Sequence, residues 1–304
     1  MQYLKFSTQF LLNRLEFPTQ RVRVVLDTDT YNEVDDQFAL AYAIKSSDKL
    51  NLEAVYAAPF HNERSSSPRN GMERSYDEIL KVLDLLNVNH ENYVFKGSTD
   101  YLKEIENPEE SEAVNDLINR AMSADDDNPL YVVAIGAITN VANAILLQPE
   151  IIKKIVVVWL GGNDLNWDHV KEFNLRQDVL ATRIVFDSGV PLVLIPCLGV
   201  ASHLITTIPE LEKCLDGKSR IGTYLTDIVR NYTKDPYGWS KVIWDISAIA
   251  WLINPDWIPT HLVHSPVITD QVTWSEDKTR HFIRSAYYVN RDPIFKDLFS
   301  KLKD

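Results

Sequence analysis

Five carboxylates within ten residues are the feature of this sequence most able to carry chemistry. They are Asp27, Asp29, Glu33, Asp35 and Asp36, and they follow a short apolar run, Val22 to Leu26. Carboxylates this crowded repel one another unless a cation neutralises them. The stretch contains no His or Cys, so a bound ion would have oxygen ligands only, which is typical of Ca²⁺ or Mg²⁺. The spacing therefore predicts a site for a hard cation.

The simpler alternative is a solvated turn that leads into a helix. Asp29 or Asp35 could cap a helix over residues 35–46, and acidic side chains are favoured in the first turn of a helix. A cap accounts for one acid and not for five. The metal-site interpretation is therefore favoured over the capping interpretation.

Four further motifs follow the acidic stretch in order. They are Gly136 to Ala142, Trp159-Leu160-Gly161-Gly162, Glu172-Phe173-Asn174 and Trp244-Asp245. Together with the acidic stretch, they resemble the inosine-uridine preferring nucleoside hydrolases, whose first strand ends in Asp-x-Asp-Pro-Gly-x-Asp-Asp. Here Thr30 to Val34 separate Asp29 from Asp35, two residues more than Pro-Gly-x. The resemblance covers roughly residues 20 to 255 and implies a divergent family member.

The resemblance implies a bound Ca²⁺ and assigns its ligands. The carboxylates of Asp29, Asp36 and Asp245 would bind the ion, and the main-chain carbonyl of Ile135 would add a neutral ligand. Asp27 would not bind the ion itself but would help to hold these ligands in position. Asp29 would also be the general base, because it would touch the water that the ion makes acidic.

The resemblance also implies a ribose site. The expected ribose-binding residues, whose acceptors and amides suit a sugar diol, are Asp35, Asn62, Asn166, Glu172 and Asn174. Trp244 stands where many relatives have a His, and this exchange resembles the purine-preferring members, in which an aromatic face stacks on the base. The expected catalytic set is Asp29, Asp35, Asn174 and Trp244. The expected reaction is hydrolysis of the N-glycosidic bond of ribonucleosides, with a leaning towards purine nucleosides.

Apolar runs and amphipathic stretches alternate along the chain and predict the elements that position these residues. Strands are expected at 22–26, 51–57, 93–96, 130–135, 155–160 and 192–195, and helices at 35–46, 72–86, 111–123, 141–147 and 179–188. A more helical part, 208–253, precedes β-rich runs at 262–268 and 286–289 and a final helix. The pattern indicates a doubly wound α/β fold with a mostly parallel, Rossmann-like sheet and antiparallel additions. Ligands of such sheets bind beyond the carboxyl ends of the strands, where the motifs lie.

Composition narrows the class of partner. The 304 residues are 45% hydrophobic and carry a net charge of −12, which opposes binding to nucleic acids and to anionic membranes. No linker or repeat divides the chain, so one domain over residues 1–304 is expected. Two cysteines and the polar residues near the N-terminus favour the cytoplasm. The family resemblance adds a nucleoside as the ligand and a homodimer or homotetramer as the assembly.

Two other functions fit parts of the sequence. Asp27-Thr28-Asp29-Thr30 after an apolar strand resembles the nucleophile motif of haloacid-dehalogenase-like phosphatases, with Asp27 as the nucleophile, but that function leaves the later motifs unexplained. Alternatively, the longer loop could misplace the attacking water, because a shift of about an ångström costs much of a reaction rate. The chain would then bind nucleosides or ribose without hydrolysing them.

Overall fold

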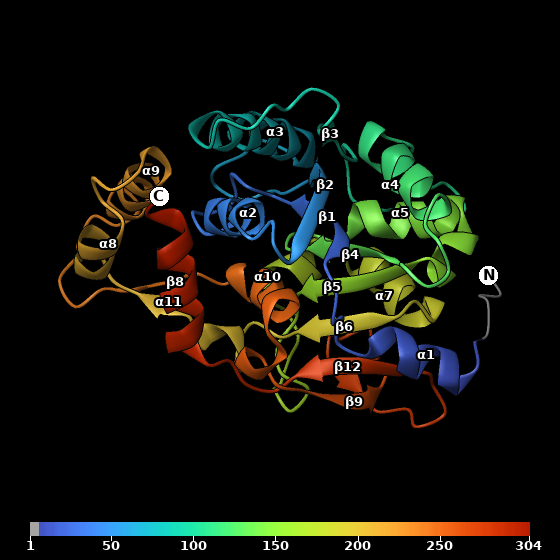
Figure 1. Cartoon of the computed structure of the whole chain (residues 1–304). Helices are drawn as coiled ribbons and strands as arrows, with labels where there is room; N and C mark the ends of the chain where they lie inside the picture. Colours follow the sequence, from blue (N-terminus) through green and yellow to red (C-terminus); the bar gives the residue numbers. More distant parts are fainter. Residues whose placement is uncertain (1–5) are drawn as a thin grey trace.

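The computed structural model describes residues 6–304, which form a central eight-stranded sheet with helices on both faces (Figure 1). The strand order is β3-β2-β1-β4-β5-β6-β12-β9, and every neighbouring pair is parallel except β12 with β9. The strands are β1 (Val22–Thr28), β2 (Leu50–Ala57), β3 (Val94–Lys96), β4 (Leu130–Ala134), β5 (Ile155–Leu160), β6 (Leu192–Ile195), β9 (Thr260–His264) and β12 (Phe282–Ala286). The predicted fold class is confirmed.

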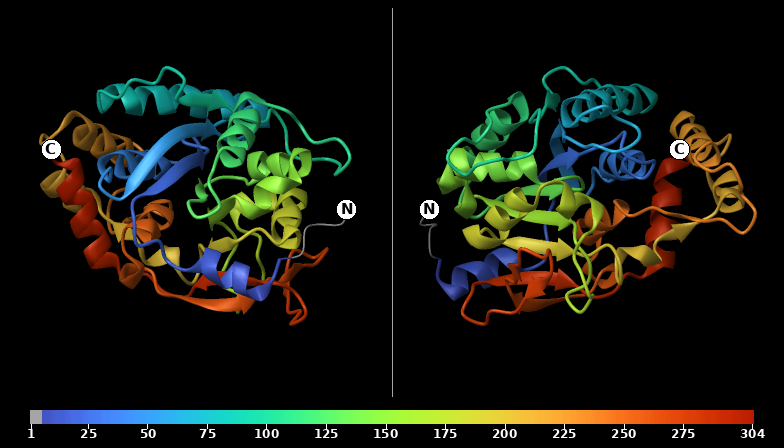
Figure 2. Two further views of the ribbon diagram at one scale, coloured as in Figure 1. Left: turned by 45° about the vertical axis from the view of Figure 1, so that its right-hand side comes forward. Right: turned by 180° about the vertical axis from the view of Figure 1, so that it is seen from behind.

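Successive strand residues point to two separate hydrophobic cores. Val24 and Leu26 of β1 pack in one core, whereas Val25 packs in the other, as the period of two in a strand requires. The first core contains residues of α2 (Asp36–Lys45), α3 (Pro68–Leu85), α9 (Arg220–Arg230), α10 (Ile246–Ile253) and α11 (Arg291–Leu302). The second contains residues of α4 (Glu112–Met122), α5 (Thr139–Leu147) and α7 (Val179–Ser188). Figure 2 shows these layers from two further sides.

The other elements lie around this framework. They are α1 (Thr8–Leu15), α6 (Phe173–Gln177), α8 (Ile208–Cys214), β7 (Ile205–Thr206), β8 (Lys241–Val242), β10 (Val267–Ile268), β11 (Trp274–Ser275) and three short 3₁₀ helices at Pro149–Lys153, Ala201–His203 and Pro255–Trp257. No helix within residues 6–304 combines the length and apolar character needed to cross a membrane.

Two parts of the chain differ from the sequence expectation. The last strand was expected at 286–289 but lies at Phe282–Ala286, where it pairs with both β6 and β9. Tyr287 and Tyr288 are half-exposed because the chain leaves the sheet at Ala286. The helix α1 was not anticipated; it begins after the Ser7 cap and buries Leu11 and Leu15.

The strand order reverses next to β1. From β1 the chain passes outward to β2 and β3, and it then returns to the other side of β1 as β4. The loops that leave β1 and β4 therefore diverge to opposite faces of the sheet and open a crevice between them. The acidic stretch follows β1 and Ile135 follows β4, so the fold places these two motifs side by side.

Candidate active site

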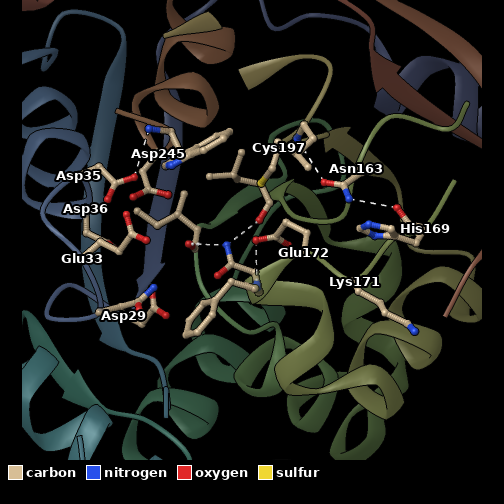
Figure 3. A pocket seen from close by; sticks show the side chains of 17 residues that line it. Asp29, Glu33, Asp35, Asp36, Asn163, His169, Lys171, Glu172, Cys197 and Asp245 are labelled. Carbon is tan, nitrogen blue, oxygen red and sulfur yellow. Dashed lines mark hydrogen bonds between the residues drawn. The ribbon is translucent and has the colours of Figure 1, made fainter. Parts of the chain in front are cut away.

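A cavity of about 200 Å³ lies at the carboxyl ends of the parallel strands (Figure 3). Its walls come from the loops after β1, β4, β5 and β6 and from the segment that precedes α10. The lining residues are Asp29, Asn32, Glu33, Asp35, Asp36, Ile135, Leu160, Asn163, His169, Lys171, Glu172, Phe173, Asn174, Cys197, Leu198, Trp244 and Asp245. Eight of the residues proposed from sequence are thus brought together: Asp29, Asp35, Asp36, Ile135, Glu172, Asn174, Trp244 and Asp245.

Three buried carboxylates converge at one end of this cavity. Oxygen atoms of Asp35, Asp36 and Asp245 all lie within 4.8 Å of one another, although Asp245 is far away in the chain. Burial, and then the charge of Asp35, raise the pKa of the Asp36 carboxyl to about 7. The same two causes raise the pKa of Asp245 well above its ordinary value. Such a cluster is costly as it stands and would be stabilised by a cation.

Asp29 supplies the sharpest test of the metal interpretation. Its side chain is buried, and neither carboxylate oxygen has a hydrogen-bond partner among residues 6–304. Burial, together with the charges of Asp36 and Asp35, raises its pKa well above the ordinary value. A buried carboxylate without a partner is strongly disfavoured. The cluster of Asp35, Asp36 and Asp245 therefore fits a hard divalent cation with an oxygen-only ligand set, as Ca²⁺ requires. The expected ligand set had Asp29 in place of Asp35, and Asp29 lines the same cavity but is not part of this cluster.

The capping alternative is not supported by the hydrogen bonds. Asp35 stands at the N-cap position of α2, but its side chain makes no capping hydrogen bond. Instead, Asp35 Oδ2 accepts from the backbone N–H of Trp244 at 3.1 Å. Asp36 accepts from the hydroxyl of Thr28 at 2.5 Å. These bonds tie the acidic loop to the segment before α10 and to the end of β1.

Gly136 allows β4 to approach Asp29. A Cβ atom at Gly136 would lie 3.0 Å from both Cγ and Oδ1 of Asp29, closer than side chains normally pack. We expect Gly136→Ala to displace the Asp29 carboxylate. The kcat of the hydrolysis expected from the sequence should then fall about tenfold or more, because a small misplacement of a catalytic group lowers the reaction rate strongly. Steady-state kinetics and a melting curve test this expectation. Wild-type kcat in a folded variant would contradict it.

The Glu172-Phe173-Asn174 motif forms the opposite wall of the cavity at the start of α6. Glu172 accepts hydrogen bonds from the backbone N–H groups of Gly162, Asn174 and Leu175 at 2.8 to 3.1 Å. Burial raises the pKa of the Glu172 carboxyl, although these bonds favour its ionised form. The motif is thus both a helix start and a wall of the cavity.

Asn174 links this wall to two strand ends. Its Nδ2 donates to the carbonyl oxygens of Ile135 at 2.9 Å and Leu160 at 3.0 Å. Both N–H donors are thereby used, so Oδ1 is the atom that Asn174 can offer to a ribose hydroxyl. The Ile135 carbonyl keeps a second lone pair, which is the one a cation would use.

Two of the expected ribose-binding residues are not among the residues that line the cavity. Asn62 lies behind the acidic loop, where its Nδ2 donates to Asn32 Oδ1 at 2.7 Å. Asn166 is exposed and bonds to Asp164. Asn163, which follows Gly162 directly, is buried and lines the cavity instead. Its position immediately after a strand-ending Gly-Gly pair was the available signal.

Several cavity residues were not proposed from sequence. His169 and Lys171 lie across the cavity from the acids (Figure 3), and Cys197 follows β6. Burial, and then the charges of Glu172 and Asp245, raise the pKa of the Cys197 thiol well above its ordinary value. The thiol therefore stays protonated and is not a nucleophile.

Comparison with known proteins agrees with this geometry. The family model "Inosine-uridine preferring nucleoside hydrolase" matches residues 24–292. The chain belongs to this family. A putative pyrimidine-specific ribonucleoside hydrolase RihB from Shigella boydii is 32% identical over 166 residues, which cover 52% of this chain and 67% of that protein. RihB from Escherichia coli O1:K1 is equally identical over the same length, but the match covers only 52% of it.

Solved structures of nucleoside hydrolases share the fold. A purine-preferring ribonucleoside hydrolase from Gardnerella vaginalis superposes with a TM-score of 0.76 at 22% identity, covering 92% of this chain and 98% of that one. An inosine-uridine preferring nucleoside hydrolase from Bacillus anthracis gives a TM-score of 0.69 at 17% identity, covering 93% and 99%.

Family membership removes the support for a phosphatase. Asp27, the nucleophile in that alternative, is fully buried and does not line the cavity. Its Oδ1 accepts from Asn140 Nδ2 at 2.7 Å, and Asn140 Oδ1 in turn accepts from the backbone N–H of Ser98. Burial raises the pKa of Asp27 to about 7. Asp27 is therefore held in the interior, behind the cavity.

Proposed function

We propose that this nucleoside hydrolase family member hydrolyses the N-glycosidic bond of ribonucleosides in a Ca²⁺-dependent reaction and prefers purine nucleosides. The observation that carries this proposal is the convergence of oxygen atoms of Asp35, Asp36 and Asp245 within 4.8 Å. The buried carboxylate of Asp29, which has no hydrogen-bond partner among residues 6–304, lines the same cavity. Asp29, Asp36, Asp245 and the Ile135 carbonyl would hold the ion. A bound Ca²⁺ would grip the ribose diol and make a neighbouring water more acidic.

The remaining chemistry is assigned to residues of the chain. Asp29 takes the proton from the attacking water, because its oxygens have no hydrogen-bond partner in the part of the chain that the structure describes. Asp35 and Asn174 Oδ1 accept hydrogen bonds from ribose hydroxyls, and Glu172 adds a carboxylate on the same wall. As the base departs, positive charge develops on the ribose ring. The surrounding carboxylates stabilise this charge electrostatically.

Aromatic side chains support the preference for purines. Trp244 and Phe173 both line the cavity, and stacking on an aromatic ring favours a flat two-ring base. His169 and Lys171 also line the cavity, on the side away from Asp35, Asp36 and Asp245 (Figure 3). The RihB relatives are described as pyrimidine-specific, so uridine is the necessary comparison substrate.

The proposal is tested by following base release from inosine, adenosine and uridine with Ca²⁺ and with excess EDTA. We expect release of free base that stops when EDTA removes Ca²⁺ and recovers when Ca²⁺ is added back. Among the three substrates, we expect a higher kcat/KM for the purine nucleosides inosine and adenosine than for uridine. A higher kcat/KM for uridine would contradict the purine preference alone. Nucleoside-dependent stabilisation against heating without product would instead support a silent binding protein.

A further inference from the structure

A buried lysine lies beside the acidic loop and is not explained by the chemistry above. Lys241, in β8, is 5% exposed, and its Nζ donates to the carboxylate of Glu33. It also donates to the carbonyl of Val242 at 3.0 Å and lies 3.6 Å from Asp35 Oδ1. The ammonium thus donates two hydrogen bonds and also forms an ion pair with Asp35, so its charge is compensated by two carboxylates of the acidic loop.

We propose that Lys241 is a positioning residue that sets the carboxylate of Asp35 for ribose binding; this inference rests on the proposed function. Asp35 is held from both oxygens, because Oδ2 accepts from the backbone N–H of Trp244 while Oδ1 faces Lys241. Lys241 and Trp244 belong to the segment that also delivers Asp245 to the cluster. The segment from Lys241 to Asp245 thus places Asp245 in the acidic cluster and also orients Asp35, the acid proposed to contact the ribose.

The longer acidic loop makes this lysine necessary. The loop brings the carboxylate of Glu33 to the cavity wall, close enough to Asp35 for the two charges to repel. Lys241 lies between them and neutralises one negative charge. Arg64 Nη1 fixes the same loop from the other side by donating to the Glu33 carbonyl at 2.7 Å. Arg64 and Lys241 therefore both hold Glu33, and of these two residues Lys241 is the one that also pairs with Asp35.

The decisive experiment is a double-mutant cycle with Lys241→Met and Asp35→Asn, measured with inosine and Ca²⁺. Methionine keeps most of the length of the side chain and removes the charge. We expect Lys241→Met to lower kcat/KM about 100-fold, as a displaced substrate-binding group does. In the Asp35→Asn background, the same change should have less than about a threefold further effect, because coupled residues are not additive.

Lys154 offers a matched control away from the cavity. Its ammonium donates to the carbonyl of Ala124 at 2.9 Å and pairs with Asp126 at 2.6 Å, and its side chain is 17% exposed. Lys154→Met therefore also removes a partly buried lysine with a carbonyl and a carboxylate partner. We expect it to change the melting temperature without changing kcat or KM.

The outcomes separate this inference from the proposed function. A wild-type protein that releases no base overturns the proposed function, and the inference with it. If the wild type is active and a folded Lys241→Met variant has unchanged kcat/KM, the inference alone is overturned. It is also overturned if the fold-losses of Lys241→Met and Asp35→Asn simply multiply in the double variant, because the two residues would then act independently.

A second variant covers the case in which Lys241→Met does not fold. Lys241→Arg keeps the charge, but a planar guanidinium presents its donors in a different geometry from an ammonium. We expect its kcat/KM to fall about tenfold with the fold retained. Wild-type kcat/KM in Lys241→Arg would then overturn the inference.

Discussion

Replacement of Asp29 by Asn is expected to lower kcat for inosine by about three orders of magnitude and to stabilise the Ca²⁺-free protein. An amide cannot accept the proton of the attacking water, and removal of a general base typically costs 10² to 10⁴ in rate. Without Ca²⁺, burial and the charges of Asp36 and Asp35 oppose ionisation of Asp29, so the folded protein keeps a proton there that the unfolded chain releases near pH 4. A neutral amide at this position needs no proton, so the melting temperature in EDTA at neutral pH should rise.

The two effects of this substitution have opposite signs, which distinguishes it from simple disruption of the fold. Asp48→Asn is the control, because Asp48 is exposed and does not line the cavity. It should leave both kcat and the melting temperature in EDTA unchanged. If Asp29→Asn retained more than a tenth of the wild-type kcat, Asp29 would not be the general base.

The stabilisation that Ca²⁺ gives to the fold is expected to grow steeply between pH 5.5 and pH 8. Without the ion, the folded protein keeps protons on Asp36, whose pKa is raised from 3.8 to about 7, and on Asp245 and Asp29. The unfolded chain loses these protons near pH 4, so stability falls as pH rises to 7. One carboxyl shifted this far accounts for roughly 4 kcal/mol. A bound cation removes this cost, because it favours the ionised carboxylates.

The measurement is the difference in melting temperature between excess Ca²⁺ and EDTA at several pH values. Taking the difference cancels groups that titrate far from the ion. Asp36→Asn should make the difference smaller and less dependent on pH. A difference that is the same at pH 5.5 and pH 8 would show that the clustered acids are not the groups that bind the ion.

The fold was readable from the sequence because regular elements leave periodic signals. The apolar runs of β1, β4 and β5 and the amphipathic helices between them were expected within a few residues of their observed bounds. A parallel sheet with both faces covered requires such continuous apolar strands. The boundary errors, such as that of β12, occurred where an apolar run continued after the chain had left the sheet.

Within the site, the sequence predicted the residues that directly follow strands. Asp29 and Ile135 reach the cavity because β1 and β4 are neighbours and end at the same edge of the sheet, and Asp36 reaches it from the start of α2. The loop after β5 carries no periodic signal. The family resemblance implied Asn166 as a ribose contact, whereas the structure brings Asn163 to the cavity and leaves Asn166 exposed.

The sequence by itself determined the fold class, the acidic stretch after β1 and the order of the motifs, because each depends on neighbours in the chain. Only the tertiary structure decided that Asp245 joins Asp35 and Asp36, that both oxygens of Asp29 lack partners within residues 6–304, and that Lys241 faces Glu33. These facts depend on contacts between residues about 200 positions apart, as the separation of Glu33 from Lys241 shows. Such contacts are set by the packing of whole elements, which leaves no local pattern in the sequence.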